Sequence, residues 1–163
     1  MVIAVDFDGT CVTEAFPLVG REIGAAPVLR YLASRGHRII LYTMRSHMMK
    51  GAKDPDRGDF SRVDLGRDVL QDAIDWFKDH DIPLFSVNKF PNQEEWTASP
   101  KCGCDLFIDD RALGCPMKDV LDGMRINPFV DWIAVTIQLV QRGVIDSKDH
   151  YRLLQEITKE LNL

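Results

Sequence analysis

The sequence has no long apolar run, no cluster of basic residues and few cysteines, and each absence excludes a class of protein. No stretch approaches the roughly 20 apolar residues that a membrane-spanning helix needs, so we expect no membrane insertion. Lysine and arginine number 20 against 25 aspartates and glutamates, and this net charge of −5 argues against nucleic acid as a partner. Four cysteines are too few and too unevenly placed for a disulfide scaffold.

Targeting signals, internal repeats and low-complexity tracts are also missing. The first residues lack the basic lead of a signal peptide and carry a charge at Asp6, so we expect a reducing, cytoplasmic location. A chain of 163 residues with 45% hydrophobic residues suits one domain, which we expect to span residues 1–163.

Short apolar runs alternate with segments of helical period, which is typical of an α/β domain with a parallel sheet. We therefore expect a Rossmann-like sheet flanked by helices. Strands are predicted over Val2–Val5, Ile39–Tyr42, Leu84–Val87 and Asp105–Ile108. Helices are predicted over Ile23–Arg35, Asp64–His80 and Phe129–Gln141, with a further C-terminal helix capped by Ser147.

Two polar stretches, residues 46–62 and 88–103, are long for loops inside a compact domain, and such loops are often functional. The first is locally basic and contains Gly51 and Gly58. We expect it to act as a lid over an anionic substrate, the alternative being a surface loop with no role.

Polar residues of one chemical kind follow three of the predicted strands. Asp6 and Asp8 end the first strand, Thr43 ends the second, and Asp109 with Asp110 ends the fourth. The carboxyl ends of parallel strands share one edge of a sheet, so these side chains should converge. Clustered carboxylates repel unless a cation offsets their charge, and oxygen ligands suit Mg²⁺.

This arrangement predicts phosphoryl chemistry. Asp6 could attack phosphorus to give an aspartyl-phosphate, and Asp8, on the same strand face, could act as general acid and base. Thr43 and Met44 could hold phosphate oxygens. Arg45 and Arg111 could contact the anion of the substrate, or could be plain surface arginines.

The motifs Asp6-Phe-Asp-Gly-Thr10 and Leu106-Phe-Ile-Asp-Asp110, with the strand ending at Thr43 between them and a later lysine, resemble the four motifs of the haloacid dehalogenase superfamily of phosphatases. The resemblance extends to about Gly114 and does not cover the helices expected from about residue 129. It implies that Asp6 is the nucleophile and Asp8 the acid/base. It also implies Mg²⁺ bound by the Asp6 side chain, the Asp8 carbonyl and Asp110, with Asp109 as support.

The active-site lysine that the resemblance implies has two candidates. The family often has Lys-Pro here, whereas this chain has Lys89-Phe90-Pro91. Lys89 follows the third strand and so falls on the expected active edge, whereas Lys101 precedes the fourth strand. We therefore favour Lys89. The short intervals between the motifs leave no room for a large cap domain.

The function expected from these residues is Mg²⁺-dependent hydrolysis of a phosphomonoester, either a small metabolite or a phosphorylated macromolecule. One alternative is a 5′-nucleotidase-like member of the superfamily, which would need an aromatic residue near the edge, such as Phe16, Phe60 or Phe90. The other is a non-catalytic phosphate-binding protein.

Two further groups of residues have structural interpretations. Cys102, Cys104 and Cys115 lack the usual zinc spacing and are expected to be buried thiols. An apolar stripe on the helix after residue 129 is expected to lie in the core or in a homo-oligomer interface. It consists of Trp132, Val135, Ile137 and Leu139.

Overall fold

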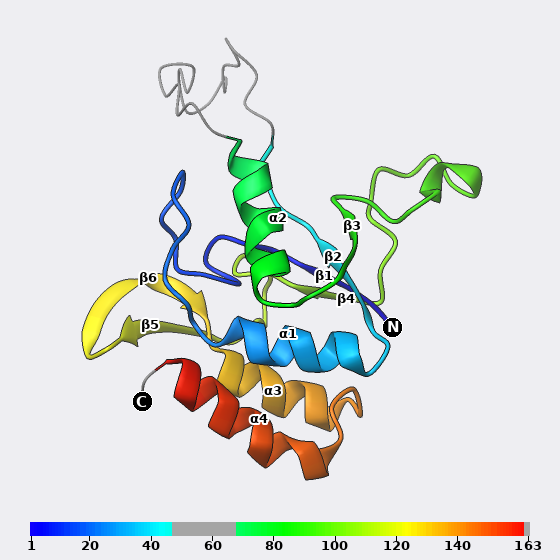
Figure 1. Cartoon of the computed structure of the whole chain (residues 1–163). Coiled ribbons are helices and arrows are strands. Elements are labelled where there is room, and N and C mark those ends of the chain that lie inside the picture. Colours follow the sequence, from blue (N-terminus) through cyan, green and yellow to red (C-terminus); the bar gives the residue numbers. More distant parts are fainter. Residues whose placement is uncertain (47–67, 162–163) are drawn as a thin grey trace.

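A computed structural model of the chain describes residues 1–46 and 68–161 (Figure 1). The predicted lid, residues 46–62, therefore lies outside the described residues except for Ser46. Within the described ranges, no helix combines the length and the apolar character needed to cross a membrane.

Four parallel strands form the main sheet, in the spatial order β3-β2-β1-β4. The chain leaves β1 on one side to form β2 and β3, and returns on the other side as β4. In open parallel sheets, ligands bind at the carboxyl ends of the strands where such a reversal occurs. The bounds, each within one residue of the predicted ones, are β1 (Val2–Val5), β2 (Arg38–Leu41), β3 (Leu84–Val87) and β4 (Leu106–Ile108).

Helices alternate with these strands and then follow them. They are α1 (Ala25–Ser34), α2 (Val69–Asp79), α3 (Trp132–Gln141) and α4 (Ser147–Glu160). The predicted α/β class is confirmed, and the described residues contain no large cap domain. Ser147 was the wrong cap for the last helix. Asp146 precedes it and its carboxylate accepts from the N–H of Lys148 at 3.1 Å, which leaves Ser147 as the first helical residue.

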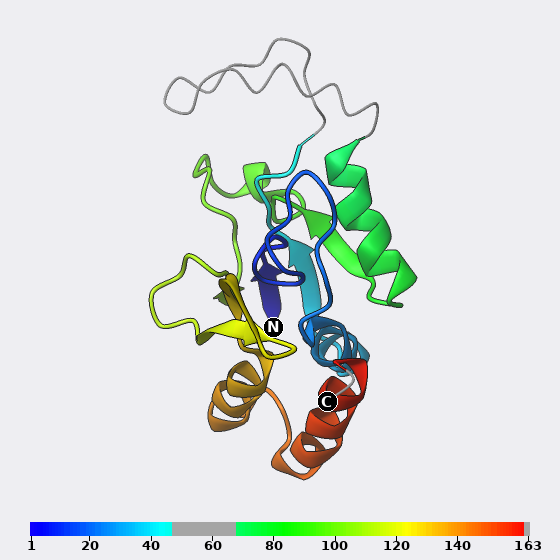
Figure 2. The same ribbon diagram turned by 90° about the vertical axis from the view of Figure 1, so that its left-hand side faces the viewer.

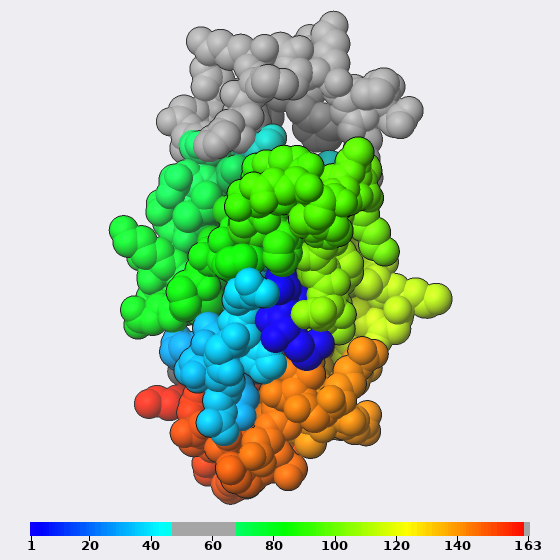
Figure 3. Space-filling view, turned by 90° about the vertical axis from the view of Figure 1, so that its right-hand side faces the viewer, coloured from blue at the N-terminus to red at the C-terminus, as the bar shows by residue number. Residues whose placement is uncertain are grey.

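The two faces of the sheet are covered differently. Ile3 and Val5 of β1 point into a large cluster that contains residues of all four helices. Val2 and Ala4 point the other way, into a smaller cluster with Cys102 and no residue of the four α-helices. Figure 3 shows the segment between β3 and β4, in light green, spread over this side of the molecule above the N-terminal residues. The helices therefore cover one face of the sheet, and the segment between β3 and β4 covers the other.

An antiparallel hairpin, β5 (Met117–Leu121) and β6 (Met124–Val130), stands outside the main sheet and was not predicted (Figure 2). Asp122 and Gly123 join its strands with φ of 52° and 74°, the pair typical of a type I′ turn. The helix predicted from Phe129 was wrong at its start: Phe129 and Val130 belong to β6, and Asp131 caps the helix, its carboxylate accepting from the N–H of Ile133 at 3.1 Å.

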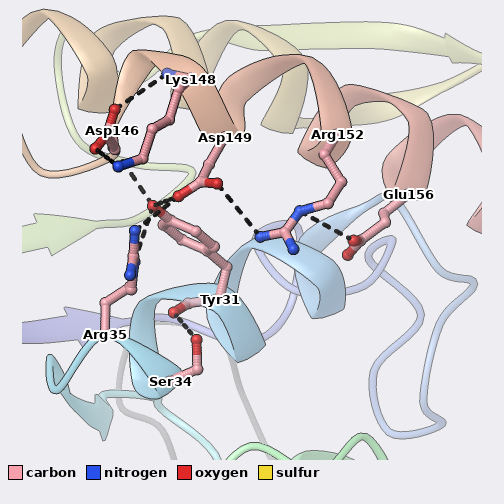
Figure 4. A network of polar contacts seen from close by, with 8 residues as sticks. All are labelled: Tyr31, Ser34, Arg35, Asp146, Lys148, Asp149, Arg152 and Glu156. Atoms are coloured by element: carbon pink, nitrogen blue, oxygen red, sulfur yellow. Dashed lines mark hydrogen bonds and ion pairs between the residues drawn. The ribbon is translucent and has the colours of Figure 1, made fainter.

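The C-terminal helices pack beneath α1 in Figure 1 and are held there by a polar network (Figure 4). Asp149 of α4 accepts from the Tyr31 hydroxyl at 2.9 Å and from the Arg35 guanidinium at 2.8 Å. Arg35 also donates to the Tyr31 oxygen at 3.3 Å. Tyr31 is almost fully buried. The hydroxyl of this one residue therefore joins the start of α4 to the middle of α1.

Tyr31→Phe should lower the free energy of unfolding by about 1–2 kcal/mol, because it removes a hydrogen bond to a carboxylate in a partly buried site. Urea denaturation at pH 7 measures the loss. Tyr151→Phe is the matched control, since Tyr151 lies on α4 with 72% of its surface exposed and should tolerate the change. Equal stability of both variants would contradict the role given to the Tyr31 hydroxyl.

Candidate active site

The Thr10 hydroxyl connects the two strand ends that carry the predicted carboxylates. It donates to Asp6 Oδ2 at 3.1 Å and accepts from the N–H of Asp110 at 3.0 Å. β1 and β4 are also joined at their carboxyl ends, where the N–H of Asp6 donates to the carbonyl of Ile108 at 3.0 Å. Asp6 and Asp110, more than a hundred positions apart in the sequence, are thereby held side by side at the carboxyl edge of the sheet.

Asp6, Asp109 and Asp110 each offer one carboxylate oxygen, and these oxygens lie within 4.8 Å of one another. Burial raises the pKa of Asp6 from 3.8 to about 7, and the charges of Asp109 and Asp110 add to the effect. The pKa of Asp110 is also raised, first by burial and then by Asp109. Three acidic groups held this close favour a proton or a bound cation among them.

Gly9 leaves the space that the side chain of Asp110 occupies beside β1. Gly9 has φ of 74°, which favours glycine, and a Cβ there would lie 2.8 Å from Asp110 Oδ2. The chain then makes a tight turn in which the N–H groups of Thr10, Cys11 and Val12 approach the carbonyl of Phe7. This turn directs the side chain of Thr10 back toward the carboxylates.

Asp8 does not join this cluster but pairs with Arg45. The Arg45 guanidinium donates to both oxygens of Asp8 at 2.7 Å, and also to the carbonyls of Leu18 at 2.7 Å and Val69 at 3.2 Å. The Arg45 side chain is 1% exposed and that of Asp8 16%. Arg45, expected at the surface or against substrate, is therefore a buried residue that holds four segments of the chain together.

The end of β2 lies beside β1 and carries Thr43 and Met44. The N–H of Thr43 donates to Asn88 Oδ1 at 2.7 Å, and the Thr43 hydroxyl oxygen accepts from the N–H of Arg45 at 3.1 Å. In the part of the chain that the structure describes, no acceptor takes the hydroxyl hydrogen of Thr43, whereas its N–H is already used. Met44 is 94% exposed and makes no hydrogen bond within the described part of the chain.

The remaining predicted residues lie at the surface. Lys89 follows β3 and is exposed, and among the described residues its ammonium group pairs with no carboxylate. Lys101 is exposed as well and lies four residues before Asp105, whose N–H bonds to the carbonyl of Val2 at the start of β1. Arg111 is exposed beside Asp110 and lowers its pKa, although burial and Asp109 outweigh this effect.

Cys11 and Trp132 donate hydrogen bonds to the backbone of the candidate site. The Cys11 thiol donates to the carbonyl of Asp6 at 3.2 Å, and burial raises its pKa well above 9.0. Such a thiol is a poor nucleophile. The Trp132 indole N–H, at the start of α3, donates to the carbonyl of Thr10 at 2.7 Å. The C-terminal extension is thus attached directly to the turn that holds Thr10.

Two residues that matter at this edge, Thr10 and Asn88, received no role from the sequence. Thr10 follows Asp6 by four positions, the distance that a tight turn spans, and this spacing could have indicated it. Asn88 has φ of 57°, a conformation that asparagine tolerates better than most residues, directly after β3. The pairing of Arg45 with Asp8 could not be predicted in this way, because 37 positions separate the two residues.

The comparison with solved structures finds a similar fold in a protein of unstated function. The structure of a conserved protein from Bacteroides thetaiotaomicron is similar to this chain, with 29% sequence identity and a TM-score of 0.58. The match covers 88% of this chain and 91% of that protein. No protein-family model and no curated protein matches the chain. The comparisons therefore support the fold and leave the activity to be argued from the residues.

Asp6→Asn should stabilise the protein at high pH in the presence of chelator. Since the pKa of Asp6 is raised in the folded state, wild type loses stability as the pH rises from about 4 to about 7. The variant has no such loss, and its advantage over wild type should grow by about 2–3 kcal/mol between pH 5 and pH 8. Urea denaturation at the two pH values measures this, and an advantage independent of pH would contradict it.

Arg45→Met should lower the free energy of unfolding by about 3–5 kcal/mol, because it leaves the Asp8 carboxylate partly buried without its partner. Arg111→Met is the control, since the exposed side chain of Arg111 has no such partner. The double variant Asp8→Asn with Arg45→Met should recover part of the loss. A single variant as stable as the Arg111 control would show that the ion pair contributes nothing.

Proposed function

We propose that the protein is a phosphatase that hydrolyses phosphomonoesters through an aspartyl-phosphate on Asp6 and depends on Mg²⁺. The observation that carries this proposal is the convergence of Asp6, Asp109 and Asp110 within 4.8 Å at the switch point of a parallel sheet. A structural ion pair would need a basic partner in this cluster. Among the described residues no basic side chain forms an ion pair with these three carboxylates: Arg45 is bound to Asp8, and the exposed Arg111 lowers the pKa of Asp110 only in part.

The donor set fits a hard divalent cation. All three side chains offer oxygen, which Mg²⁺ prefers. Burial is the main cause of the raised pKa values of Asp6 and Asp110, and the neighbouring carboxylates add to it. Asp6, Asp109 and Asp110 would hold the ion. When bound, it would neutralise the carboxylates and the phosphate of the substrate, so that two anions can approach each other.

Asp6 would attack phosphorus with one carboxylate oxygen while Thr10 orients the other. The hydrogen bond from the Thr10 hydroxyl to Oδ2 keeps the plane of the carboxylate fixed. Attack forms the bond from Asp6 to phosphorus and breaks the bond to the leaving alcohol, which takes up a proton. Water then attacks phosphorus, gives up a proton and releases inorganic phosphate and Asp6.

Of the two aspartates Asp6 and Asp8, Asp8 would exchange these protons, and its side chain is bound to Arg45. Both of its carboxylate oxygens accept hydrogen bonds from the Arg45 guanidinium at 2.7 Å, which fixes the orientation of the carboxyl group. Asp8 would give a proton to the leaving alcohol in the first step and accept the proton of water in the second.

A nucleotidase-like specificity is the second candidate, favoured by the position of Phe16. Its ring is half-exposed and lies 5.5 Å from the Arg45 guanidinium carbon, next to the candidate site, where a base could stack on it. Phe90, the other described candidate, contacts Phe85 and Trp96 beside the smaller cluster instead. Phe60 lies outside the described residues.

Asp6→Asn should reduce phosphate release to the background of the assay, because the amide cannot act as the nucleophile. The substrates are p-nitrophenyl phosphate, sugar phosphates and nucleoside monophosphates, each with Mg²⁺ or with excess chelator. Asp8→Asn should lower turnover by about 10²–10⁴-fold. Asp79→Asn, at an exposed position of α2, is the control and should retain wild-type rates.

Activity that survives chelation, or undiminished turnover by Asp6→Asn, would refute the mechanism. Binding of inorganic phosphate without turnover of any ester would favour the non-catalytic alternative. Preference for nucleoside monophosphates that Phe16→Ala abolishes would favour the nucleotidase-like one.

A further inference from the structure

A second group of metal-type ligands lies away from the candidate active site. Glu22 comes from the segment before α1, His80 caps the C-terminus of α2, and Glu160 is the last residue of α4. Each offers one ligand atom, and these atoms lie within 4.8 Å of one another. The group draws together three parts of the chain that are far apart in sequence.

His80 has its ring orientation fixed by a backbone carbonyl. Its Nδ1 lies 2.7 Å from the carbonyl oxygen of Trp76, which can only accept, so the hydrogen of the neutral ring is on Nδ1. The lone pair of Nε2 then faces Glu22 Oε1 at 3.4 Å. Ligating histidines are typically held in this way, with the second ring nitrogen donating to a carbonyl or carboxylate.

The separation of these two atoms fits a shared cation better than a direct hydrogen bond. A charge-assisted N–H···O bond is about 2.7–2.9 Å long. Two ligands at one tetrahedral zinc, with bonds of about 2.0–2.1 Å, lie roughly 3.3–3.4 Å apart. The 3.4 Å between His80 Nε2 and Glu22 Oε1 matches the separation of two ligands of one zinc ion.

Unsatisfied oxygens at the same place point to a missing positive partner. Glu22 Oε2 and Glu160 Oε2 are both shielded from solvent, and neither has a hydrogen-bond partner among residues 1–46 and 68–161. Burial raises the pKa of Glu160 to about 7, with the charge of Glu22 as the next cause. Buried acceptors without donors are costly, and a cation would satisfy them together with the lone pair of His80.

The surroundings of the group also suit a metal. The Trp76 indole N–H donates to Glu22 Oε1 at 2.7 Å, so Trp76 orients both Glu22 and His80. The side chains of Glu22 and His80 are 34% and 24% exposed, so the group lies close to the surface, where an ion can reach it. Arg30, whose Nε donates to the carbonyl of His80 at 3.0 Å, balances part of the negative charge from outside.

We propose that Glu22, His80 and Glu160 form a binding site for a zinc-type divalent cation, which fastens the end of α4 to the end of α2 and to the segment before α1. The imidazole ligand favours Zn²⁺ or Co²⁺ over Mg²⁺, so the site differs in chemistry from the oxygen-only cluster of Asp6, Asp109 and Asp110. It is independent of the proposed phosphatase activity.

Titration of the metal-free, tag-free chain with Zn²⁺ by calorimetry, and with Co²⁺ by visible absorption, tests the proposal. The background is Asp110→Asn, which removes a ligand of the other cluster. One equivalent should bind, and saturating Zn²⁺ should raise the melting temperature. His80→Ala and Glu160→Gln should each weaken binding by about 100-fold or more, since loss of a residue that only supports a ligand already costs 10–100-fold. His37→Ala, a histidine outside any such group in the described residues, is the control.

Circular dichroism separates misfolding from loss of a ligand, and Glu160→Gln keeps the size and shape of the side chain. The site is refuted if the metal-free chain binds neither ion, or if His80→Ala binds Zn²⁺ as tightly as the His37→Ala control. The site is also refuted if Zn²⁺ does not stabilise the wild-type chain and Glu160→Gln is more stable than wild type at pH 8. Glu22 and Glu160 would then share a proton in place of a metal ion.

Discussion

The buried ion pair between Arg45 and Asp8 is the interaction on which the candidate active site depends. Arg45 leaves β2 and reaches Asp8 after β1, the carbonyl of Leu18 and the carbonyl of Val69 at the start of α2. A guanidinium that is 1% exposed must find a partner for nearly every donor, and these groups supply them. The positions of the segments around the candidate site are therefore set by the geometry of one side chain.

The ion pair also separates the two aspartates of the first motif. Burial, with the charges of Asp109 and Asp110, raises the pKa of Asp6 to about 7, whereas Asp8 has the Arg45 guanidinium against both of its oxygens. Two carboxyl groups two positions apart are thus placed in opposite electrostatic environments, a condition under which a pair of acids can take different roles. Thr10 adds the geometry, since its hydroxyl holds Asp6 and the backbone of Asp110 together.

Periodicity and strand ends were enough to predict the sheet and the approach of Asp6 to Asp109 and Asp110, because both follow from local pattern and from the parallel sheet. Arg45 was beyond such reasoning, since nothing local distinguishes a buried arginine from a surface one. The β5–β6 hairpin was a missed signal, because Asp122-Gly123 is the typical dipeptide of a two-residue turn. Lys89 remains a prediction, and the lid lies outside the described residues.

The hydrogen bond from the Trp132 indole to the carbonyl of Thr10 has a consequence for the order of events during synthesis. Residues 1–10 leave the ribosome before residue 132, so the turn that orients Thr10 gains this partner only after Trp132 has been synthesised. β4, which directly precedes Asp109 and Asp110, is also synthesised later than this turn. In a nascent chain the carboxylates are therefore not yet assembled, and the geometry of the candidate site is completed only when β4 and α3 have docked.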